Sequence, residues 1–170
     1  EFTTASGTPR DGGGPGVKRY AVAPGNFSST AMWSETSGGS PGASVPLPQD
    51  DVYLDASSGA GTYVLNMPRS CRNINCTGFT RALNTGIGST SIFGSLTLGA
   101  GMTFNTAGGG GIDLTHVASG TITTNGVTVG HGLSLTCSNI SLTDDFIGTA
   151  VYGLSVAALS TFTSNNHTMT

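Results

Sequence analysis

The sequence predicts an all-β fold, a single-stranded parallel β-helix, from three observations. After Arg81 the chain holds only three charged side chains, Asp113, Asp144 and Asp145. In the same region Ser and Thr alternate with Leu, Ile and Val, which is the two-residue period of a half-buried strand, over residues 95–98, 121–123, 127–129, 133–136 and 140–143. Residues 122–130 also match residues 162–170 at an offset of 40. Such a repeat, made of strands and turns, is typical of a solenoid, with about 20 residues per coil; a β-sandwich is the alternative.

Residues 1–18 are expected to form an extended arm or linker. Residues 1–17 contain five glycines and two prolines and have no periodic apolar face, so they cannot build a core alone. Fully extended, they could span about 55 Å at about 3.3 Å per residue, enough to lie across a neighbouring subunit. A disordered linker is the alternative. The lack of an initiator Met, and an end at Thr170 within a strand pattern, lead us to expect an excerpt truncated at its C-terminus.

Residues 19–56 are expected to cap the solenoid or attach it, because the first coil has an open edge of unpaired N–H and C=O groups. Trp33 is predicted to be the buried anchor of this cap, with stacking on a sugar as the alternative. The glycine-rich stretch 37–42 lets the backbone turn back, and Val52 and Leu54 alternate inward in the strand that follows.

Residues 57–170 are expected to form the repeating coils. Asn105, Asn125 and Asn165 are spaced by multiples of 20, which predicts turn asparagines that hydrogen-bond along one edge of the stack. The four glycines at 108–111 are interpreted as a flexible turn between coils, because no Lys and no helix follow them. Cys71 and Cys76 match no zinc or redox spacing and are predicted to face the coil interior.

Composition and charge exclude several classes of protein. Charged residues make up 9% of the chain, against about 25% in ordinary globular domains, so a typical cytosolic α/β enzyme is excluded. All six basic residues precede position 82, and the net charge is −3, so nucleic-acid binding is not expected. No stretch reaches the roughly 18 apolar residues of a membrane-spanning helix, and no membrane span is expected.

The residues that could carry chemistry favour no enzyme, so no catalytic residue, cofactor or metal site is predicted. Asp50 with Asp51, and Asp144 with Asp145, are sequence neighbours whose side chains point to opposite faces of a strand, and they are expected to be solvated turn residues. The three histidines, His116, His131 and His167, have no spacing typical of metal ligands. Motifs for a serine nucleophile, a phosphate loop or a zinc protease are absent from the sequence.

A more specific signal lies in four segments: Arg19-Tyr-Ala-Val-Ala-Pro-Gly-Asn-Phe-Ser28, Ala31-Met-Trp-Ser34, residues 36–46 and Asp50-Asp-Val-Tyr-Leu-Asp-Ala56. They resemble a module that recurs in tail and surface proteins of bacteriophages, especially aquatic and cyanobacterial ones. Phe27 stands where the usual form has a tryptophan, whereas Trp33 keeps the second aromatic residue. The stretches 71–80, 94–104 and 124–128 are similar to the repeats that follow this module, so the resemblance covers about residues 19–170.

The resemblance implies a β-helical virion protein without a catalytic motif. We therefore expect a subunit of a tail fibre or another tail-attached appendage on the surface of a phage particle. Its N-terminal arm would contact other virion proteins, a homotrimer would form, and a host surface glycan or protein would be the adhesion partner. A capsid decoration protein and a bacterial extracellular adhesin are the alternatives. A polysaccharide depolymerase is the least favoured, since so few carboxylates follow residue 56.

Overall fold

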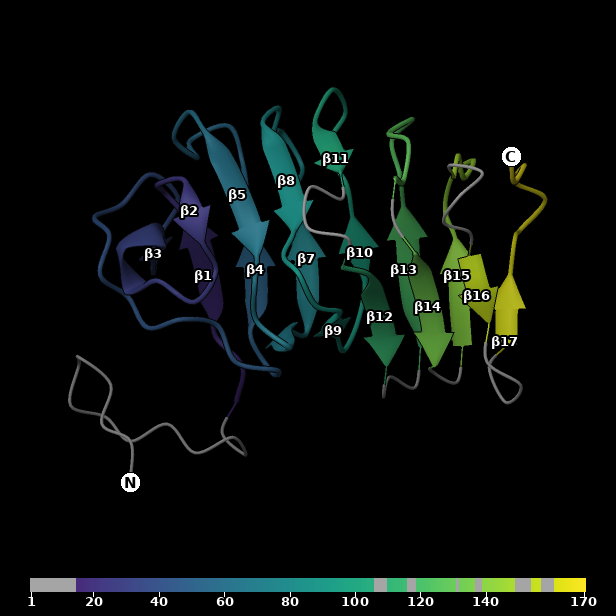
Figure 1. Ribbon diagram of the computed structural model, residues 1–170, viewed down its shortest axis with the longest axis horizontal. Helices are drawn as coiled ribbons and strands as arrows, with labels where there is room; N and C mark the ends of the chain where they lie inside the picture. The colour runs from purple at the N-terminus through teal and green to yellow at the C-terminus, as the bar shows by residue number, and fades with distance from the viewer. Residues whose placement is uncertain are drawn as a thin grey trace.

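The computed structural model confirms a parallel β-helix (Figure 1). It describes residues 15–105, 110–115, 119–130, 132–136, 139–148, 154–156 and 161–170. The sole helix within these ranges is a single 3₁₀ turn, η1 (Thr30–Met32), and no helix in them is long and apolar enough to cross a membrane. The coils stack side by side along the long axis of the molecule, and β1 and β17 lie at opposite ends of the stack.

Three sheets run along this axis. Sheet 1 has eight strands in the order β17-β15-β13-β10-β7-β4-β1-β3. Its strands in chain order are β1 (Lys18–Ala21), β3 (Trp33–Ser34), β4 (Asp51–Tyr53), β7 (Asn73–Asn75), β10 (Leu96–Thr97), β13 (Gly120–Thr123), β15 (Asn139–Leu142) and β17 (Thr161–Thr163). All neighbours pair in parallel except β3, which pairs antiparallel with β1 at the end of the sheet. This last strand covers the edge that a first coil would otherwise leave open.

Sheets 2 and 3 complete the coils, and their pairs are parallel as well. Sheet 2 consists of β2 (Gly25–Asn26), β5 (Thr62–Leu65), β8 (Ala82–Thr85) and β11 (Thr103–Asn105). Sheet 3 consists of β6 (Arg69–Cys71), β9 (Thr90–Ile92), β12 (Ile112–Thr115), β14 (Leu133–Thr136) and β16 (Leu154–Val156). One coil therefore contributes one strand to each of the three sheets, for example β4, β5 and β6. The next coil adds the neighbouring strand to each sheet.

The strand register gives the length of each coil on sheet 1. Asp51 is opposite Asn73, a step of 22 residues, and Ile122 is opposite Leu142, a step of 20. The step from Leu96 to Ile122 is 26 residues and contains the glycine run, and the step from Lys18 to Asp51, which contains the cap, is the longest at 33. The 40-residue offset thus spans two coils, as the sequence predicted. The next step, from Ile140 to Phe162, is 22 residues rather than 20, so residues 122–130 and 162–170 are two residues out of register on this sheet.

The core is a set of apolar columns, because inward side chains repeat at the same position of each coil. Val52, Ile74, Leu96 and Ile122 form one column on sheet 1, and all four are buried. Parallel columns on the other sheets are Tyr63, Leu83 and Phe104, and Ile92, Leu114 and Leu135. Each coil is too thin to bury its own apolar face, so stability depends on stacking with its neighbours.

Two of the predicted turn asparagines hydrogen-bond between coils, as expected. Asn125 and Asn165 share a left-handed backbone, with φ of 50° and 52°. The side chain of Asn125 donates to the Leu98 carbonyl and that of Asn165 to the Leu142 carbonyl, at 2.7 and 2.8 Å. Each asparagine thus binds the backbone of the preceding coil rather than another asparagine. The side chain of Asn105 lies outside the described part of the structure.

Candidate functional site

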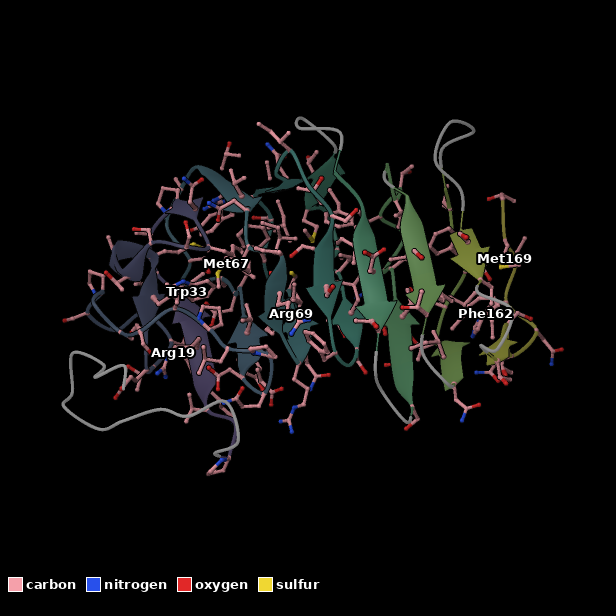
Figure 2. All side chains as sticks on the ribbon, turned by 60° about the horizontal axis from the view of Figure 1, so that its bottom comes forward. Arg19, Trp33, Met67, Arg69, Phe162 and Met169 are labelled. Atoms are coloured by element: carbon pink, nitrogen blue, oxygen red, sulfur yellow. The ribbon has the colours of Figure 1, made fainter. Side chains whose placement is uncertain are left out.

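The cap is held by a buried aromatic pair. Trp33 is fully buried, its indole N–H donates to the Phe27 carbonyl at 2.8 Å, and the two rings meet edge to face at 4.9 Å. Figure 2 labels Trp33 within the cap, beside Arg19. The interpretation of Trp33 as a packing anchor is therefore confirmed, and a residue with no exposed ring face cannot stack on a sugar.

Two buried charged residues fix the loop that precedes β4. Asp50 is fully buried, and its carboxylate accepts hydrogen bonds from the backbone N–H groups of Val17 and Leu47, at 3.0 and 2.9 Å. Arg19 is 5% exposed, and its guanidinium donates to the carbonyl and hydroxyl of Ser44 at 2.9 and 2.7 Å. The expectation that Asp50 is a solvated turn residue is wrong, because a carboxylate that accepts backbone N–H groups can be buried at low cost.

The neighbouring acids each bind different partners. Asp51 is half-buried on the outer face of sheet 1, whereas Asp50 is buried, so their side chains diverge as the sequence predicted. Asp144 accepts hydrogen bonds from the backbone of Thr124 and Asn125 in the preceding coil. Asp145 accepts one from the backbone of Thr168 in the following coil, at 2.9 Å. Asp144 and Asp145 therefore connect three coils.

Of the cysteines and histidines, the described ranges contain Cys71, Cys76 and His167. Cys71 and Cys76 are fully buried free thiols, as predicted, and burial raises the pKa of both. His167 lies 3.5 Å from the Asp145 carboxylate, between Nδ1 and Oδ1. No group of three or more potential metal ligands occurs among the described residues. His116, His131 and Cys137 lie outside them.

The outer face of sheet 1 carries two columns of side chains in register, one residue from each coil. The first column reads Lys18, Asp51, Asn73, Ser95, Thr121, Ser141 and Thr163, and the second reads Tyr20, Tyr53, Asn75, Thr97, Thr123 and Thr143. Hydrogen bonds link members of neighbouring coils, such as Thr123 with Thr143 at 2.6 Å. From Ser95 onward these columns contain no ionisable side chain.

The capped end of this face holds a denser group, which we call the tyrosine patch: Lys18, Tyr20, Asp51, Tyr53 and Arg72. The two tyrosine rings stack with centroids 5.0 Å apart and planes 21° apart, and the Lys18 ammonium lies 5.6 Å from the Tyr53 ring centroid. Arg72 binds Asp51 through two hydrogen bonds, from Nε at 2.9 Å and Nη2 at 2.6 Å. This geometry suits contact with a partner that has both apolar and charged surface.

The electrostatics of the patch follow from the Asp51–Arg72 pair. Partial burial by itself raises the pKa of Asp51, but the hydrogen bonds from Arg72 and Asn73 and the charges of Arg72 and Lys18 outweigh burial and lower that pKa. The hydrogen bonds to Asp51 and the negative charge of Asp51 raise the pKa of Arg72. Both groups are therefore charged at neutral pH.

A second surface feature is a hollow of about 440 Å³ at the corner between sheets 2 and 3. Val64, Met67 and Ile87 supply its apolar lining, and Asn26 and Asn66 lie at its edge. Asn66 is already engaged with Ser28, whose backbone N–H and hydroxyl lie 3.0 and 2.8 Å from its amide. The hollow contains no charged side chain that would orient a ligand.

Comparison with known proteins adds no relative: no family model, no curated protein and no solved structure matches the chain. The site must therefore be judged from geometry. Sequence reasoning missed the tyrosine patch. Its signal was present, because Lys18 and Tyr20, like Asp51 and Tyr53, are two residues apart and so share one strand face. The sequence did not show the register that places Lys18 opposite Asp51 and Tyr20 opposite Tyr53.

Proposed function

We propose that the chain is a structural subunit of a bacteriophage particle, part of a tail fibre or another tail-attached appendage. In this role the N-terminal arm that precedes β1 docks on other virion proteins, and the solenoid supports adhesion to the host. The resemblance of residues 19–56 to a module of phage tail and surface proteins favours this class. The charge-poor outer face of sheet 1 from Ser95 onward and the absence of a metal-ligand cluster among the described residues are compatible with it.

The observation that carries the proposal is the way the chain enters the cap. Val17 is held on both sides, since its N–H donates to the Asp50 carboxylate and its carbonyl accepts from the Asp51 N–H at 2.9 Å. A Cβ on Gly16 would lie 1.8 Å from the Gln49 carbonyl oxygen, so the backbone passes this point in close contact. A firmly anchored entry point at the closed end of a rigid stack suits an attachment arm, because load on the arm is passed to β1 and then to sheet 1.

A homotrimer is part of the proposal. Its flat coil faces, lined by Ser, Thr and small apolar residues, would meet about a threefold axis. Sedimentation equilibrium of the purified chain tests this point, and a monomer at micromolar concentration would contradict it.

The decisive experiment is a cryo-EM reconstruction of the intact particle that carries the chain. Few copies at the tail, with the N-terminal arm ordered against tail subunits, are the expected result. Hundreds of copies on the shell would identify a capsid decoration protein instead. Recovery of the chain from a cell surface and not from any particle would identify a bacterial adhesin, and either result would overturn the tail assignment.

A further inference from the structure

The tyrosine patch differs from the rest of the outer face of sheet 1 in both shape and charge. Four of its residues belong to β1 and β4, and Arg72 directly precedes β7; these three strands are neighbours at the capped end of sheet 1 (Figure 1). Tyr20 and Tyr53 are half-buried, so their rings are held in place yet reach solvent. A tyrosine held in this way supplies contact area on binding at little cost in conformational entropy. Further along the same column, the aromatic residues give way to Asn75 and Thr97.

The charge that the patch presents to solvent is positive. Lys18 and Arg72 each bring one positive charge and Asp51 one negative charge, which leaves a balance of +1. The side chain of Asp51 is 18% exposed and is engaged by Arg72 and by the Asn73 amide at 2.7 Å, whereas that of Arg72 is 51% exposed. The cationic side chains are therefore more exposed to solvent than the carboxylate. Arg72 uses Nε and Nη2 on Asp51, so Nη1 can face a ligand.

We propose that the tyrosine patch binds an acidic glycan, with a sugar carboxylate facing Lys18 and Arg72 and a sugar ring lying against the tyrosines. The inference rests on the proposed adhesion function and names the chemistry of the receptor. Charge complementarity selects an anionic ligand, and the tyrosines favour one with an apolar ring face. Beyond the patch, the uncharged amides and hydroxyls of Asn75, Thr97 and Thr123 offer hydrogen bonds to the next sugar units.

Single-stranded nucleic acid is the rival anionic ligand. It also combines rings with negative charge, and bases stack on aromatic side chains. It is disfavoured because a polyphosphate needs several cations along its track. Here the columns carry no ionisable side chain from Ser95 onward, and the whole chain has a net charge of −3.

The test uses the full chain, with alginate disaccharides, whose carboxylates match the two cations of the patch, as the uronate probe and dextran oligosaccharides as the neutral probe, in isothermal titration calorimetry at low salt. Lys18→Gln removes one charge from the patch, and Tyr53→Leu removes one ring while keeping an apolar side chain. Arg81→Gln is the matched control, because it removes the same charge from an exposed arginine that precedes β8 on sheet 2. Trp33 emission in each variant verifies that the cap is folded.

Alginate is expected to bind the wild type and dextran is not. Lys18→Gln and Tyr53→Leu should each weaken alginate binding about fivefold or more, with Arg81→Gln close to wild type. No alginate binding, equal binding of dextran, or an equal loss in Arg81→Gln would overturn the proposal. Tighter binding of oligothymidylate than of alginate would assign the patch to nucleic acid instead. These measurements use purified protein, so a negative result leaves the location on the particle to be decided by cryo-EM.

Discussion

Replacing Asp50 by Asn tests whether a buried carboxylate fastens the arm and the cap to the first full coil. Both oxygens of Asp50 accept backbone N–H groups, Oδ1 from Val17 and Oδ2 from Leu47. Asn keeps the shape but has one acceptor oxygen, and its NH₂ group then faces a backbone N–H. A hydrogen bond to a charged group contributes about 1.5–3 kcal/mol. Losing one such bond and weakening the other should cost about 2–3 kcal/mol.

Trp33 makes this cost measurable, because the only tryptophan of the chain lies in the cap. Urea unfolding should be followed by Trp33 emission for the cap and by far-ultraviolet circular dichroism for all coils. With a slope of about 2 kcal/mol/M, the emission midpoint of Asp50→Asn should fall by about 1 M. The dichroism midpoint should fall less, since coils far from the cap depend on their own neighbours.

The control for this experiment is Asp55→Asn. Asp55 accepts from the backbone of Ser57, two residues away, at 2.8 Å, so its loss affects one turn only. An emission midpoint of Asp50→Asn that matches the wild type, or matches Asp55→Asn, would refute the role assigned to Asp50.

Three further predictions concern packing, thiol access and acid stability. Gly99→Ala should lower the free energy of unfolding by about 1–3 kcal/mol in thermal or urea unfolding, because its Cβ would lie 2.1 Å from the Cys76 carbonyl oxygen. Gly88→Ala, whose Cβ would have no atom within 4 Å, should be close to neutral, and equal effects of the two changes would contradict the stacking. Cys71 and Cys76 should resist iodoacetamide at pH 8 until urea unfolds the chain, since burial raises the pKa of both thiols. Rapid labelling of either cysteine in the native protein, measured by peptide mass spectrometry, would disprove this prediction. The lowered pKa of Asp51 means that its contribution to stability is present above pH about 4 and is lost as the pH falls through that pKa. Asp51→Asn should remove up to about 1 kcal/mol at pH 7 and less at pH 2, and a difference that does not change with pH would refute the sign.

The parallel β-helix could be predicted from the sequence because its signal is local and repeated. Alternation of Leu, Ile and Val with Ser and Thr defines strands, and recurrence along the chain defines coils. The burial of Trp33, Cys71 and Cys76 followed from the same reasoning, since apolar groups in a thin core have few other places to go. The burial of Asp50 could not be predicted, because it depends on Val17, 33 residues earlier in the chain.

The sequence by itself determined the fold class, the alternation of inward and outward side chains within strands and the charge-poor character of residues 82–170, because each depends on composition or on a period of two residues. Only the tertiary structure decided the register, with steps of 20 to 33 residues on sheet 1. Register is set by turn length and by side-chain bonds between coils, such as that of Asn125 to Leu98, and neither follows from a repeat count. The tyrosine patch arises from register alone, since Tyr20 and Tyr53 meet only because Lys18 lies opposite Asp51.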